Sequence, residues 1–81
     1  MTYAELETVV LARDLPEVGL KAGDLGAIVH VHSPTSFDVE FVRASGATQA
    51  LVTVSLDQLR SVTDRDLIAV RPADPPAPGP I

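Results

Sequence analysis

The chain contains no cysteine and only three aromatic residues, Tyr3, Phe37 and Phe41. The absence of cysteine excludes disulfide bonds and thiolate zinc sites, and it fits a reducing compartment. Because aromatic residues are so few, most of the core must come from valine, leucine, isoleucine and alanine. β-Branched residues favour strands, since their restricted χ1 angles suit a pleated surface.

Positive charge and long apolar runs are also scarce. Six Lys and Arg residues stand against eleven Asp and Glu residues, so the formal net charge is −5. Nucleic-acid binders neutralise phosphates with clustered cations, and here no two cations are adjacent, so a nucleic-acid partner is disfavoured. No apolar run approaches the ~18–20 residues that cross a bilayer. No signal sequence begins the chain, and we expect a soluble, cytoplasmic protein.

Short apolar runs separated by turn signals fill the 81-residue chain. The run 37–42 alternates, with Phe37, Val39 and Phe41 on one face, which is typical of a half-buried antiparallel strand. A 3₁₀ turn is predicted over 56–58. The five predicted strands are 8–11, 25–32, 37–42, 49–55 and 59–62.

Residues 67–71 predict a sixth strand, in preference to a helical turn beginning at Thr63 or Asp64. Five to six short antiparallel strands with a long loop after the first predict an all-β fold, a small SH3-like barrel over residues 1–71. Residues 72–81 hold five of the seven prolines and predict a flexible Pro-rich tail. Its Pro-x-x-Pro motifs match ligands of aromatic grooves, although a disordered end is the favoured interpretation.

Several segments together resemble a known family. They are residues 5–11, 14–16, 19–26, 39–41 and 51–59. Over residues 5–71 the chain resembles domain-of-unknown-function family 4926, which consists of small bacterial proteins with an SH3-like fold. Its Gly-x-x-x-Gly-Asp-x-Gly loop is similar to loops of KOW-type ribosomal and transcription modules and of SH3-like accessory subunits of enzymes. The resemblance implies a fold and a bacterial source, and it implies no catalytic residue.

His30 and His32 are two residues apart on a predicted strand, so both side chains point to one face. That spacing suits two metal ligands, but a metal site needs a third or fourth ligand. A four-residue turn at 33–36 would place His30 opposite Val39 and His32 opposite Phe37, away from the acidic residues of the next strand. A register shifted by one residue would bring those acids to the histidines. Partly exposed histidines are the favoured interpretation, and His-based metal binding is an alternative.

The glycine-rich loop is predicted to have structural roles at Gly19, Gly23, Asp24 and Gly26. An aspartate between turn glycines usually accepts hydrogen bonds from nearby backbone amides, so this role is favoured over acid–base catalysis, and Asp14 is interpreted in the same way. Gly26 inside a strand indicates a bend or a close backbone approach. The sequence shows no Ser-His-Asp triad and no phosphate-binding loop, so we expect no enzymatic activity and no cofactor.

These observations favour a non-enzymatic binding module that acts through a protein partner. The expected surface combines the 13–24 loop with the hairpin tip at 33–36. Its candidate residues are Pro16, Glu17, Lys21, Asp24 and Pro34. The acidic residues solubilise the surface or, less favoured, form a face for a basic partner. An antitoxin or immunity protein and an accessory subunit of an enzyme both stay open. A KOW-like nucleic-acid-binding module is the alternative function, and the sequence leaves the oligomeric state open.

Overall fold

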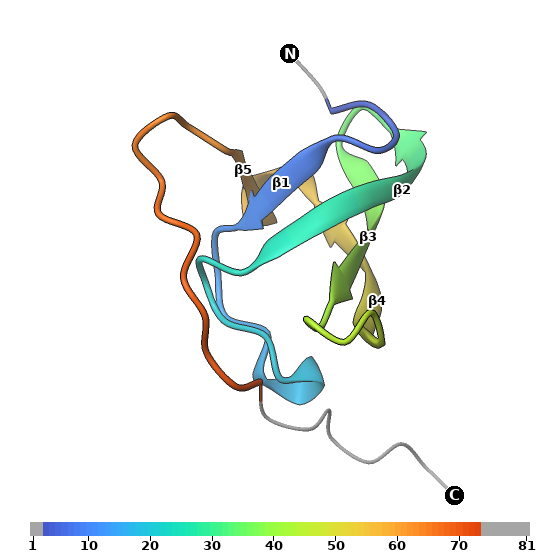
Figure 1. Ribbon diagram of the computed structural model, residues 1–81. Coiled ribbons are helices and arrows are strands. Elements are labelled where there is room, and N and C mark those ends of the chain that lie inside the picture. Colours follow the sequence, from blue (N-terminus) through green and yellow to red (C-terminus); the bar gives the residue numbers. More distant parts are fainter. Residues whose placement is uncertain (1–2, 74–81) are drawn as a thin grey trace, which may run out of the picture.

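The computed structural model describes residues 3–73. Its strands are β1 (Thr8–Leu11), β2 (Leu25–Ser33), β3 (Ser36–Val42), β4 (Thr48–Ser55) and β5 (Leu59–Ser61). Two 3₁₀ turns, η1 (Pro16–Val18) and η2 (Leu56–Gln58), precede β2 and β5. The strands form one antiparallel sheet in the order β4-β3-β2-β1-β5 (Figure 1). The prediction of an all-β fold is therefore confirmed. Each of the five strands begins and ends within one residue of its predicted bounds.

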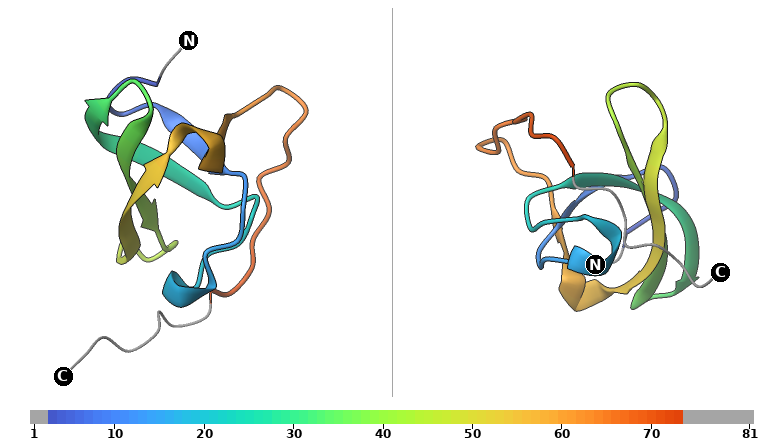
Figure 2. Two further views of the ribbon diagram at one scale, coloured as in Figure 1. Left: turned by 180° about the vertical axis from the view of Figure 1, so that it is seen from behind. Right: turned by 90° about the horizontal axis from the view of Figure 1, so that it is seen from below.

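The sheet curls around a small aliphatic and aromatic core. Because β1 pairs with both β2 and β5, the sheet closes most of a barrel, which Figure 2 shows from below. Phe37 and Val39 are fully buried and Phe41 is 2% exposed, so the alternation of β3 gives the predicted core face. The other buried members of this core are Val9, Leu11, Leu20, Ile28, Ala50, Val54 and Leu59.

Gly26 lies where β2 passes directly over side chains of β3. A Cβ atom on Gly26 would lie 2.6 Å from Val39 Cγ1 and 2.8 Å from Phe41 Cε2. Both distances are well inside van der Waals contact, so a larger residue would force the core apart. The glycine in this strand therefore permits a close backbone approach.

The predicted sixth strand at 67–71 is wrong, since none of these residues is in a strand. After β5 the chain turns at Thr63–Asp66 and leaves the edge of the sheet before it can pair with it. We call residues 62–71 the strap. In Figures 1 and 2 the strap runs along the outside of the barrel, from β5 to the end where η1 lies.

The predicted Pro-rich tail falls mainly outside the described residues. Only its first two residues, Pro72 and Ala73, are described, and neither is in a helix or strand. In the part of the chain from Tyr3 to Ala73, no helix is long and apolar enough to cross a membrane.

Candidate interaction surface

The loop between β1 and β2 is folded rather than loose. Its two limbs are joined by hydrogen bonds from Leu15 N to Leu20 O (2.9 Å) and from Leu20 N to Leu15 O (3.1 Å). Gly19 ends η1 with a φ of 72°, a left-handed conformation that glycine adopts without steric cost. Leu20 is buried in the core, while Pro16 and Glu17 are exposed at the tip. The loop therefore holds its tip residues in a defined position.

Two aspartates stabilise the second limb of this loop. Asp14 Oδ1 accepts a hydrogen bond from Ala22 N (2.8 Å), and Asp24 Oδ2 accepts one from Lys21 N (2.8 Å). Gly23, which directly precedes Asp24, has a φ of 98°. Both carboxylates thus act on backbone amides of the turn, which is a structural use of these side chains.

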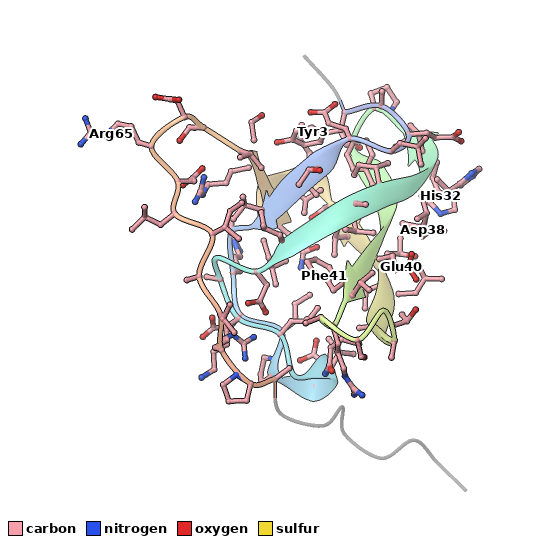
Figure 3. The ribbon with its side chains drawn as sticks, viewed as in Figure 1. Tyr3, His32, Asp38, Glu40, Phe41 and Arg65 are labelled. Atoms are coloured by element: carbon pink, nitrogen blue, oxygen red, sulfur yellow. The ribbon has the colours of Figure 1, made fainter. Side chains whose placement is uncertain are left out.

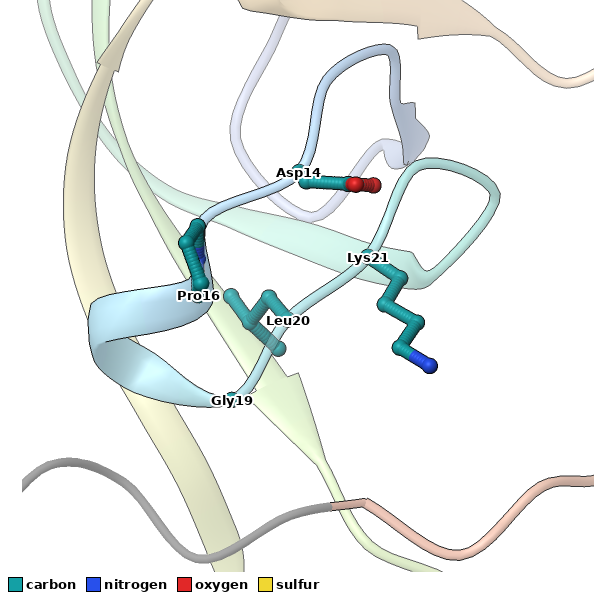
Figure 4. Close-up of a pocket in the computed structure, with 5 residues that line it drawn as sticks. All are labelled: Asp14, Pro16, Gly19, Leu20 and Lys21. Atoms are coloured by element: carbon teal, nitrogen blue, oxygen red, sulfur yellow. The ribbon is translucent and has the colours of Figure 1, made fainter.

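A small depression lies between the limbs of the loop (Figure 4). It is lined by Asp14, Pro16, Gly19, Leu20 and Lys21. Its volume is about 100 Å³, whereas small-molecule sites usually measure ~300–1,000 Å³. The loop is therefore better suited to contact a macromolecule than to enclose a small ligand.

The end of the strap is bound to this loop by an ion pair. Arg71 Nε donates to Asp24 Oδ1 (3.1 Å), and a second guanidinium nitrogen of Arg71 pairs with Asp24 Oδ2. Such two-point contacts fix the orientation of both groups. The side chains of Arg71 and Asp24 are only 31% and 20% exposed. The contact joins residues 47 positions apart, and no local sequence signal predicts it.

The beginning of the strap is held by a second ion pair. Arg60 donates two hydrogen bonds to the carboxylate of Asp66, each 2.9 Å long, and Thr63 N donates a third of 2.7 Å. These contacts hold the pKa of Asp66 far below its usual value and raise the pKa of Arg60. The Thr63-x-x-Asp66 spacing is a known turn and capping pattern, so the sequence did contain a signal for this turn.

Between the two ion pairs the strap presents apolar side chains to solvent. Leu67, Ile68 and Val70 are 92%, 83% and 96% exposed. Within the described part of the chain, residues 67–70 make no hydrogen bond through their backbone. We call the 13–24 loop and the strap together the clasped surface, since Asp24 and Arg71 join them.

Sequence comparison places this architecture in a family. A model described as "Domain of unknown function (DUF4926)" matches residues 5–61. The chain belongs to the DUF4926 family. No curated protein matches the chain, and no solved structure does either. The DUF4926 match ends at the last residue of β5, so the strap lies outside the matched segment.

Pro34 lies away from the other candidate residues. It follows β2 in the turn before β3, at the top of Figure 1, whereas η1 lies at the bottom. The neighbouring Thr35 accepts a hydrogen bond from Leu56 N (2.9 Å), which attaches this turn to η2. The DUF4926 barrel therefore separates two elements that the sequence interpretation had combined into one surface, and Pro34 is not part of the clasped surface.

The histidines lie beside an acid rather than opposite apolar residues. Ser33 pairs with Ser36, as the four-residue turn requires, but β2 is irregular between Val31 and Ser33. The pairing of His30 with Val39 is therefore wrong, and His30 pairs with Asp38, as in the shifted register. His32 lies beside Asp38 in Figure 3, and its Nε2 is 2.9 Å from Asp38 Oδ1. The imidazole rings of His30 and His32 are 4.5 Å apart. Hydrogen bonds from Thr53 and His32 lower the pKa of Asp38. Across residues 3–73 no three His, Asp or Glu side chains are grouped so that they could hold a metal ion.

A buried glutamine connects η1 to the sheet, which the sequence interpretation missed. Gln49 is 7% exposed. Its Oε1 accepts a hydrogen bond from Arg43 Nε (2.7 Å), and its Nε2 donates to Val18 O (3.1 Å). Gln49 is the second residue of β4. Nothing in the sequence around this uncharged polar residue predicts that it is buried. This contact holds the tip of the 13–24 loop against the barrel of the DUF4926 domain.

Proposed function

We propose that this protein is a non-enzymatic binding module of the bacterial cytoplasm that acts by binding a protein partner at the clasped surface. The observation that supports this proposal most strongly is the exposure of Leu67, Ile68 and Val70 in a segment held at both ends. Burial of apolar surface contributes ~25 cal/mol per Å². In the isolated chain these side chains stay in water, so a partner that covers them gains that free energy.

The backbone of the strap favours one mode of contact. Residues 67–70 belong to no helix or strand, and within residues 3–73 they leave their amides and carbonyls unpaired. A segment with unpaired backbone groups can add a strand to the exposed sheet edge of another protein. Because the two ion pairs already restrict the strap, binding orders fewer free bonds and costs less conformational entropy.

The candidate residues of the 13–24 loop provide a polar border for this contact. Glu17 and Lys21 are exposed, and the Asp24–Arg71 ion pair brings their loop to the end of the strap. The net charge of −5 favours a partner with a basic surface, since complementary charge speeds association. An antitoxin or immunity protein and an accessory subunit of an enzyme both work through such a contact.

The positions of the cations argue against the KOW-like alternative. Three of the six cationic side chains are paired with aspartates, in the ion pairs Arg13–Asp57, Arg60–Asp66 and Arg71–Asp24. A cation already paired with a carboxylate releases fewer counterions on binding a phosphate. We therefore keep nucleic-acid binding as an outcome of the test rather than as a second proposal.

The test is partner capture with matched surface variants. Tagged full-length protein is incubated with extract of its own cells, and bound proteins are quantified by mass spectrometry. Ile68→Ser combined with Val70→Ser should abolish capture of the partner. Leu6→Ser is the control, because Leu6 is as exposed as Ile68, at 83%. Equal capture by the strap variant would contradict the proposal, as would tight binding of random RNA or DNA that weakens steeply with salt.

A further inference from the structure

The two edges of the sheet differ in how they are protected. β5 has only three residues, includes Arg60, and is followed at once by the turn of the strap. β4 has eight residues, Thr-Gln-Ala-Leu-Val-Thr-Val-Ser, with neither a charge nor a proline. Proteins usually protect a sheet edge with charged residues, proline or a covering segment, because an open edge pairs with other strands. By its sequence β4 is an unprotected edge.

The structure leaves the middle of this edge open. Among the described residues, β4 pairs with β3 alone, and residues 50–54 make no backbone hydrogen bond with any other element. Leu51 is 61% exposed, and Thr53 is exposed beside it. The contact with η1 is made by Gln49, before this stretch begins.

We propose that β4 is the interface between two copies of this chain, paired antiparallel about a two-fold axis. A two-fold axis places the same strand on both sides, so an uncharged β4 meets an uncharged β4 and no like charges face each other. Val52 is the middle of the open stretch. When the pairing is centred at Val52, Leu51 lies opposite Thr53 of the second copy. The side chains of each β4 strand that face the core continue to face the core of their own copy.

Two acids that contact threonines of β4 make the contact dependent on salt. Asp38 accepts a hydrogen bond from Thr53 (2.5 Å) and Glu40 accepts one from Thr48 (2.6 Å), and both acids belong to β3. Across the dimer the two β3 strands would be three strand spacings apart, about 14 Å. That separation exceeds the Debye length of ~8 Å at physiological ionic strength, so repulsion is screened there and is felt at low salt.

The open stretch of β4 and the strap are separate, although Gln49 at the start of β4 contacts Val18 of the 13–24 loop. In Figures 1 and 2 the strap and β4 lie on opposite sides of the barrel. A dimer formed through β4 would therefore leave the strap free for a partner. Variants at either surface consequently serve as controls for the other.

Sedimentation velocity of the full chain tests this inference. We expect the average mass to rise from that of one copy toward that of two with concentration, and more so at physiological than at low salt. Leu51→Lys should weaken the dimer by at least about tenfold, because like charges facing one another destabilise a strand pair. Leu67→Lys is the matched control, since Leu67 is 92% exposed and lies on the strap. This variant should dimerise as the wild type does.

Amide hydrogen exchange of the wild type gives a second readout that needs no variant. Protection of residues 50–54 should increase with protein concentration, while protection of the strap should stay constant. A chain that is monomeric at every concentration would overturn the inference. So would a dimer that survives Leu51→Lys, or one that is lost in Leu67→Lys, because the latter would assign the contact to the strap.

Discussion

Gly26→Ala should destabilise the barrel although it adds a single methyl group. The new Cβ atom would overlap Val39 Cγ1 at 2.6 Å and Phe41 Cε2 at 2.8 Å. Both neighbours are buried, at 0% and 2% exposure, so neither can move into solvent. Forcing an extra carbon into a packed core costs ~1–3 kcal/mol. That is a large share of the ~4–12 kcal/mol expected for a domain of this length.

Urea unfolding followed by circular dichroism measures this cost. With a slope of ~1 kcal/mol per M for a small domain, the midpoint should fall by about 1–3 M. Combining Gly26→Ala with Val39→Ala should cost less than the sum of the two single changes, because the second substitution removes the overlapping Cγ1 atom.

Gly46→Ala separates contact from backbone strain. Gly46 has a φ of 95° with no atom within 4 Å of an added Cβ, so its substitution should cost ~1–2 kcal/mol through conformation alone and should be additive with Val39→Ala. If Gly26→Ala unfolds at the wild-type midpoint, or is strictly additive with Val39→Ala, then β2 does not cross β3 as described.

Three further outcomes are expected. Phe41→Ala, at a residue 2% exposed, should cost ~3–5 kcal/mol and lower the thermal midpoint measured by circular dichroism; a wild-type midpoint would contradict the core. Arg71→Ala should lower the heteronuclear NOE of the strap and leave that of β4 unchanged, because the substitution removes the ion pair that joins the strap to Asp24; unchanged NOE values in the strap would contradict the ion pair. The pKa of Asp66 is lowered, so its ion pair with Arg60 is complete above the usual aspartate pKa of ~3.9 and is lost as pH falls through the lowered value. An NMR titration of the Asp66 carboxyl should show this, and Arg60→Ala should move the midpoint upward; an unmoved midpoint would remove Arg60 as the cause.

The strands were predictable because their signals are local. The alternation from Phe37 to Phe41 has the period of a strand with one buried face, and all three apolar residues of that face are buried. The Gly-rich loop and the 3₁₀ turn before β5 follow from residues that favour turns. Each of these elements depends on neighbours a few positions away in the sequence.

The strap and the histidine register were not predicted, for different reasons. Residues 67–70 have the composition of a strand, and that composition outweighed the local Thr63-x-x-Asp66 signal for the turn that Arg60 and Asp66 close. The Asp24–Arg71 contact joins residues 47 positions apart, which no local periodicity can predict. In β2, irregular pairing shifts His30 from Val39 to Asp38, and such an irregularity leaves no clear mark in a strand this apolar.

Site-specific photo-crosslinking in living cells tests the central claim, partner binding at the clasped surface, most directly. A photoreactive amino acid replaces Ile68 in one strain and Leu6 in another, two residues of equal exposure. We predict a discrete crosslinked species between the protein and a second, different protein from position 68 and none from position 6. Equal crosslinking from both positions, or crosslinks from position 68 to nucleic acid or to a second copy alone, would contradict the account.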